Sequence, residues 1–179
     1  MTILIIGLAL WILVHWFKRL APNLRASLGD AGKGIVAVLL LAGLVLMIIG
    51  YRGAPFIAVW TPPSFLVHVN NLLMVVAVAV FAMSHTKGRL RGRMRHPMLT
   101  SVKLWSVAHL LVNGDLASIV LFGGLLVWAV GSVIMINRDE TWERPAPGDK
   151  GRDVIFIVIT VVTFAAMAGI HMVLGVNPF

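Results

Sequence analysis

Residues 95–115 read RHPMLTSVKLWSVAHLLVNGD and combine the end of a basic loop, a helix start, an apolar segment and a tight turn. Pro97 suits a helix start because proline is tolerated in the first helical turn, where an N–H has no helical partner. Asn113 begins the turn, and Asp115 is placed to cap the helix that follows. The stretch therefore predicts a short apolar helix at residues 98–112 that connects a basic loop to a second helix.

Further apolar segments lie on both sides of this one, and the chain of 179 residues is 59% hydrophobic and only 12% charged. Apolar runs near 20 residues are typical of membrane-spanning helices. We therefore expect an all-α polytopic membrane bundle that forms a single domain over residues 1–179, with Asp153 capping the last helix. The six expected spans are residues 2–17 (to 20 if the first helix continues), 34–51, 64–83, 98–112, 115–136 and 153–175.

The basic residues fall almost entirely on one side of these spans, because 14 of the 15 lysines and arginines lie in or beside alternate loops on one face and only Arg52 lies on the other. The positive-inside rule then places the basic loops in the cytoplasm and both termini outside. A basic rim that faces anionic lipid headgroups accounts for the net charge of +8 without a nucleic acid partner. The rim comprises Lys18, Arg19, Arg25, Lys33, Lys87, Arg89, Arg91, Arg93, Arg95, Lys103, Arg138, Arg144, Lys150 and Arg152.

Six histidines lie in or beside the expected spans. An ionisable side chain inside a membrane must be paired or liganded, although a single histidine there is often just an interhelical hydrogen-bond donor. His15 in WILVHWF and His109 in WSVAHLLV are flanked by tryptophan and aliphatic residues, which favour the neutral, metal-binding form of imidazole. Two such histidines from different helices suit the axial ligands of b-type haem, so we expect His15 and His109 to bind haem iron.

The other histidines leave two alternative sites open. His68, His109 and His171 lie towards the outer ends of their spans and could together bind zinc, which needs three or four ligands. His96 and His109 are 13 residues apart on one helix, about 20 Å along its axis, as in cytochromes that hold one haem at each leaflet. His85 and His96 also lie among arginines, where a solvated role is expected. The absence of cysteine excludes thiolate zinc sites, iron–sulfur clusters and covalently attached haem.

The segment HPMLTSVKLWSVAHLLVNGDLASIVLFG strongly resembles the NnrU family of bacterial inner-membrane proteins. The similarity continues in LAGLVLMIIGY, MSHTKGRLR and HMVLGVNPF, and so covers nearly the whole chain. Relatives in this family resemble 15-cis-zeta-carotene isomerase, an integral membrane enzyme with haem b, and bacterial members were named for a link to denitrification and nitric oxide metabolism. The resemblance therefore implies a multi-pass protein of the bacterial inner membrane.

The resemblance also implies roles for individual residues. His15 matches the family's first-span histidine and His109 matches the histidine of its LWxxAH segment, and these two are the proposed haem ligands of the isomerase branch. The other histidines match the HPM, SH and terminal H-x-x-x-G segments. Residues expected to support the site are His68, His85, His96, His171, Trp105, Asn113 and Asp115.

Three functions remain open at this point. The first is a haem-dependent enzyme that isomerises an apolar polyene between cis and trans forms. The second is an accessory or structural membrane protein, with or without haem, that handles nitric oxide or supports denitrification. The third is a membrane methyltransferase, because Arg95-His96-Pro97 is similar to a segment of isoprenylcysteine methyltransferases, although a downstream cofactor motif is missing. A redox partner is not identified.

Overall fold

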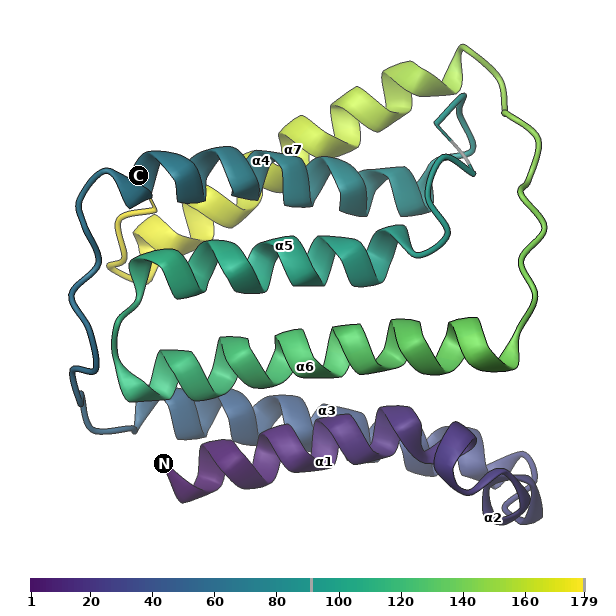
Figure 1. Cartoon of the computed structure of the whole chain (residues 1–179), viewed down its shortest axis with the longest axis horizontal. Helices are drawn as coiled ribbons and strands as arrows, with labels where there is room; N and C mark the ends of the chain where they lie inside the picture. Colours follow the sequence, from purple (N-terminus) through teal and green to yellow (C-terminus); the bar gives the residue numbers. More distant parts are fainter. Residues whose placement is uncertain (91, 179) are drawn as a thin grey trace. The chain divides into compact units, whose positions relative to one another are not determined.

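The computed structural model describes residues 1–90 and 92–178, so Arg91 of the expected basic rim lies outside the described residues (Figure 1). Within that part of the chain the regular structure is entirely helical, which confirms the expected all-α class. The helices are α1 (Thr2–Leu20), α2 (Pro22–Ser27), α3 (Ala31–Arg52), α4 (Leu66–His85), α5 (Pro97–Val112), α6 (Leu116–Asp139) and α7 (Arg152–Val173).

Six of these helices correspond to the expected spans, and their ends differ from the predicted ends by a few residues. Five are long and apolar enough to cross a membrane, namely α1, α3, α4, α6 and α7. Helix α5 has 16 residues and is therefore shorter than a full span. The protein is thus a multi-pass membrane protein. Helix α2 was not predicted: it forms inside the first basic loop, where Pro22 occupies its first turn.

The chain divides into two compact units. Unit 1 comprises Met1–Thr61 and Asn113–Trp128, and unit 2 comprises Pro62–Val112 and Ala129–Phe179. Helix α6 contributes its first half to unit 1 and its second half to unit 2.

Unit 1 is built on a close contact between α1 and α3 that requires glycine. A Cβ atom on Gly7 would lie 2.6 Å from the backbone nitrogen of Met47, and one on Gly43 would lie 3.2 Å from the Gly7 carbonyl oxygen. Gly50 is equally constrained, because its Cβ would overlap the backbone of Leu4. Small residues of this kind let membrane helices approach closely.

The start of α6 is attached to unit 1 by backbone and side-chain hydrogen bonds. The extended segment after α3 pairs with the turn before α6, since Ala58 bridges to Asp115 and Leu116 N–H donates to the Ile57 carbonyl at 2.8 Å. Asp115 Oδ1 accepts the backbone N–H of Ser118 at 3.0 Å. The predicted cap of this helix is therefore confirmed.

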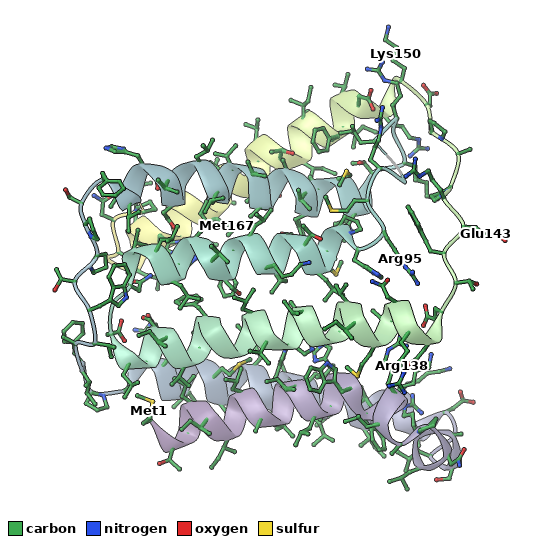
Figure 2. All side chains as sticks on the ribbon, in the orientation of Figure 1. Met1, Arg95, Arg138, Glu143, Lys150 and Met167 are labelled. Carbon is green, nitrogen blue, oxygen red and sulfur yellow. The ribbon has the colours of Figure 1, made fainter. Side chains whose placement is uncertain are left out.

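Unit 2 consists of α4 packed against α5 and α7. The loop after α4 and the loop before α7 join at one end of this unit, which we call the basic end because both loops carry lysine and arginine. Asp153 was expected to cap α7, and that prediction is wrong: its carboxylate accepts the backbone N–H of Arg89 at 2.9 Å and the Arg89 side chain. The two loops also meet where Gly148 N–H donates to the Gly88 carbonyl at 3.0 Å. Figure 2 shows Arg95, Arg138 and Lys150 at this same end of unit 2.

Candidate functional site

His15 lies on α1 in unit 1 and its imidazole is fixed by its own helix. The Nδ1–H group donates to the carbonyl oxygen of Trp11, one turn earlier, at 2.8 Å. A carbonyl oxygen can only accept, so this bond assigns the proton to Nδ1 and leaves Nε2 with its lone pair. Nε2 has no hydrogen-bond partner among the described residues. The half-buried ring therefore presents the nitrogen that binds metals.

Two indoles surround this imidazole. The ring centroid of His15 lies 4.3 Å from that of Trp11 and 4.7 Å from that of Trp128, which enters from the first half of α6. The two indoles are 5.6 Å apart in an edge-to-face arrangement. Both indole N–H groups are buried, and neither has a hydrogen-bond acceptor within the described part of the chain. Buried donors normally have partners, so two unpaired donors beside one imidazole indicate a place where a polar ligand atom would be stabilised.

His109 repeats this local arrangement on α5 in unit 2. Its Nδ1–H donates to the Trp105 carbonyl at 2.9 Å, and the two rings are 5.0 Å apart. Both predicted ligands thus occupy the last position of a Trp-x-x-x-His segment, at residues 11–15 and 105–109. Residues four apart lie on the same helix face, so the tryptophan supplies both the carbonyl and an aromatic neighbour. Trp105 therefore contacts His109 through both its carbonyl and its ring, and its role in supporting a ligand stays a prediction.

His171 on α7 is the third histidine of this kind, because its Nδ1–H donates to the Met167 carbonyl at 2.7 Å. It lies in unit 2 together with His109. Ser106 also lies on α5, one turn before His109, and its fully buried hydroxyl has no partner among residues 1–90 and 92–178.

The remaining predicted histidines have other contacts. His96 Nε2 lies 2.8 Å from Asn137 Oδ1, so its ring is hydrogen-bonded across to the end of α6. His68 is exposed in the first turn of α4, and His85 is exposed with its ring 4.7 Å from Phe81. Among the described residues no three such side chains form a metal-binding cluster, so the structure does not bring His68, His109 and His171 together as one.

Asp115 and Asn113 lie in unit 1, at the turn before α6, and Asp115 contacts the first turn of that helix. Ser118 Oγ donates to Asp115 Oδ2 at 2.5 Å, and Tyr51 Oη lies 2.8 Å from the same Ser118 oxygen. Because the single Ser118 proton is given to Asp115, the Tyr51 hydroxyl is the donor to Ser118. Asn113 directly precedes this network in the sequence.

Sequence reasoning noted the tryptophans that flank His15 but missed Trp128. Trp11 was detectable from its i, i+4 spacing to His15, whereas Trp128 lies 113 residues away and carries no local signal. The surroundings of His15 would fit a histidine that holds haem: Nε2 has the lone pair, a carbonyl holds the opposite nitrogen, and two indoles form apolar walls.

A family model described as NnrU protein matches residues 3–178, which is nearly the full length and includes both Trp-x-x-x-His segments. No curated protein and no solved structure matches the chain.

Proposed function

The chain belongs to the NnrU family, and we propose that this multi-pass membrane protein binds b-type haem with His15 and His109 as iron ligands. One observation carries the proposal: in both residues Nδ1–H is held by a tryptophan carbonyl of the same helix, which leaves Nε2 as the lone-pair nitrogen. Histidines that bind metals usually donate their other ring N–H to a carbonyl or carboxylate in this way.

The protein's own residues have defined tasks in this proposal. The Trp11 and Trp105 carbonyls fix the tautomer and orientation of the two imidazoles, so less entropy is lost when Nε2 takes a ligand. The Trp11 and Trp128 rings exclude water around His15, and their unpaired N–H groups can donate to acceptor atoms of a bound group. A bound haem would supply an iron centre able to bind nitric oxide and to exchange single electrons.

That both imidazoles bind the same iron is a proposal taken from the sequence. The family resemblance supports a role in denitrification or nitric oxide metabolism in the bacterial inner membrane, and polyene isomerisation is the alternative reaction. The two are separated by assay: a deletion strain should grow poorly on nitrite in the first case, whereas heterologous expression should convert 15-cis-zeta-carotene in the second.

The test of haem binding is an optical spectrum of the detergent-purified protein after growth with added haem. We expect b-type bands of a six-coordinate, low-spin iron in the wild type. His15→Ala and His109→Ala should each convert the spectrum to a five-coordinate form or abolish it, since each removes one Nε2 ligand. A colourless wild-type protein would refute the proposal.

The matched control is His96→Ala, because His96 is not one of the two proposed ligands and its Nε2 lies 2.8 Å from Asn137 Oδ1. Its spectrum should be that of the wild type. His171→Ala tests the other histidine with a fixed Nδ1–H, on α7. Loss of the bands in His109→Ala and His171→Ala, with His15→Ala unchanged, would move the ligand pair to unit 2 and contradict the role of His15.

A further inference from the structure

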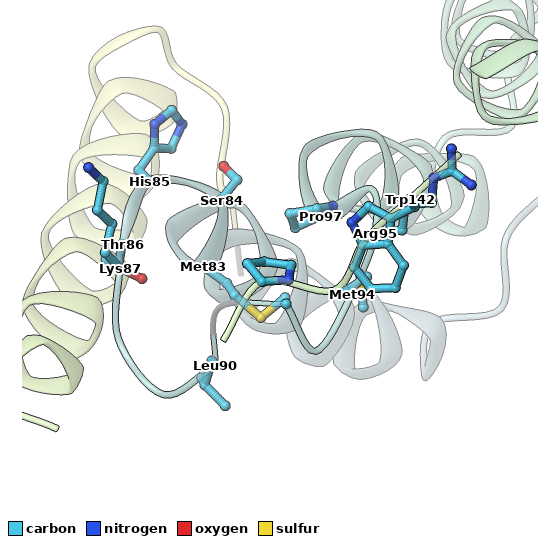
Figure 3. A pocket seen from close by; sticks show the side chains of 12 residues that line it. Met83, Ser84, His85, Thr86, Lys87, Leu90, Met94, Arg95, Pro97 and Trp142 are labelled. Carbon is cyan, nitrogen blue, oxygen red and sulfur yellow. The ribbon is translucent and has the colours of Figure 1, made fainter. Parts of the chain in front are cut away.

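A cavity of about 300 Å³ lies in unit 2 at the basic end of α4 and α5 (Figure 3), and His109 is not among the residues that line it. Its wall is formed by the end of α4, the loop that follows, the start of α5 and the segment after α6. Met83, Met94, Pro97 and Trp142 make much of this wall apolar. A cavity of this size is at the lower end of those that hold small ligands.

The same cavity is lined by the basic side chains of His85, Lys87 and Arg95, and its lining contains no aspartate or glutamate. Figure 3 shows His85 and Lys87 at one side of the cavity and Arg95 beside Trp142 at the other. An apolar interior with basic groups at its margin suits a ligand that has both an anionic group and an apolar body.

The charges of Lys87 and Arg95 are not neutralised within the described part of the protein. Neither side chain forms an ion pair with a carboxylate there, whereas the nearby Arg89 is paired with Asp153. Arg95 is instead held by carbonyl oxygens at the end of α6, since its Nη2 donates to Glu140 O at 2.6 Å. These contacts position the guanidinium while leaving its formal charge uncompensated.

Two loops that line the cavity meet in a tight junction. Gly92 has φ of 77°, and a Cβ atom there would lie 2.7 Å from the Pro145 carbonyl oxygen. Gly148 approaches Lys87 so closely that a Cβ would overlap the Lys87 carbonyl. The lining is therefore a built feature of the fold, in which glycine is required at both points of contact.

We propose that this cavity binds the phosphate group of an anionic phospholipid, with the apolar wall against the glycerol and upper acyl region. Its position carries the choice of ligand, because it lies where α4 ends and α5 begins, the level at which headgroups meet membrane-crossing helices. Basic pockets at this level of a helical membrane protein recognise anionic headgroups. The proposal is independent of haem binding.

The test measures lipid binding by native mass spectrometry of the delipidated full-length protein in detergent. Phosphatidylglycerol should bind more tightly than phosphatidylcholine, and soluble glycerol 3-phosphate should bind much more weakly than phosphatidylglycerol. Lys87→Gln should weaken phosphatidylglycerol binding about fivefold, since one basic group near a membrane surface is worth about that factor. His85→Gln and Trp142→Ala change two other exposed residues of the lining, and each should also weaken phosphatidylglycerol binding.

The matched control is Arg93→Gln, which removes one charge from the same exposed loop but does not line the cavity. Its affinity should stay within twofold of the wild type. An equal loss in Arg93→Gln and Lys87→Gln would overturn the proposal in favour of diffuse surface attraction. Equal affinity for phosphatidylcholine, or for glycerol 3-phosphate, would also overturn it, because the site would then recognise apolar surface or a soluble phosphate.

Discussion

The imidazole of His15 packs against the indole of Trp128 with ring centroids 4.7 Å apart and an interplanar angle of 63°. This contact joins α1 to the first half of α6, two segments separated by most of the chain. It places a bulky aromatic wall, with an unpaired N–H, beside a nitrogen that has its lone pair free. The candidate ligand at His15 is thus defined by a tertiary contact as well as by its own helix.

Substitutions of Trp128 test how much the indole that packs against His15 stabilises the protein. Trp128→Ala should lower the free energy of unfolding by about 3 kcal/mol, because it leaves a large cavity where the side chain is only 8% exposed. Trp128→Phe should cost less than about 1 kcal/mol, since it keeps a ring and removes a buried donor that has no acceptor in the described chain. Thermal unfolding in detergent measures both variants. Equal losses of unfolding free energy in the two variants would show that the Trp128 indole N–H has a hydrogen-bond partner in solution.

The hydrogen bond from Tyr51 to Ser118 should stabilise unit 1 measurably. Tyr51→Phe removes the donor and keeps the edge-to-face contact with Phe122, whose centroid is 6.3 Å away. We expect the free energy of unfolding to fall by about 1 kcal/mol, the value typical of hydrogen bonds between membrane helices. A double-mutant cycle with Ser118→Ala isolates the bond. Strict additivity of the two substitutions would contradict the geometry described above.

The glycines of unit 1 differ sharply in how they tolerate a methyl group. Gly50→Ala should destabilise the protein by about 2 kcal/mol, because its Cβ would overlap the Leu4 backbone and force α1 away from α3. Gly123→Ala is the matched control, since nothing lies within 4 Å of its Cβ position. That variant should be neutral or more stable by up to about 1 kcal/mol, through helix propensity. Comparable losses in both would contradict the close packing of α1 on α3.

Asp153 should restrain the loop that carries Arg89. Asp153→Ala removes the acceptor of the Arg89 backbone N–H and side chain, so trypsin should cut after Lys87 or Arg89 several times faster. Time-resolved digestion in detergent with mass analysis measures the rates. Asp30→Ala removes an exposed carboxylate from another loop, paired only with Lys33, and should leave these cuts unchanged. An unaltered rate in Asp153→Ala would refute the restraint.

Much of the architecture was predictable because it depends on local sequence. Membrane-spanning helices are recognised from continuous apolar length, so all six apolar helices were placed to within a few residues. The cap at Asp115 was predictable because the capping residue and the N–H it accepts are three positions apart. Helix α2 was missed because it is short and polar, with little but Pro22 to mark it. Haem ligation by His15 and His109 stays a prediction.

By itself, then, the sequence determined the helices, the one-sided distribution of basic residues, and the two Trp-x-x-x-His segments that fix each imidazole within its own helix. Only the tertiary structure decided that Trp128 lies against His15, that Asp153 binds Arg89 instead of capping α7, and that a basic cavity opens beside Trp142. The physical reason is distance along the chain: helix formation and capping act over about one turn, whereas these contacts join segments whose pairing depends on packing.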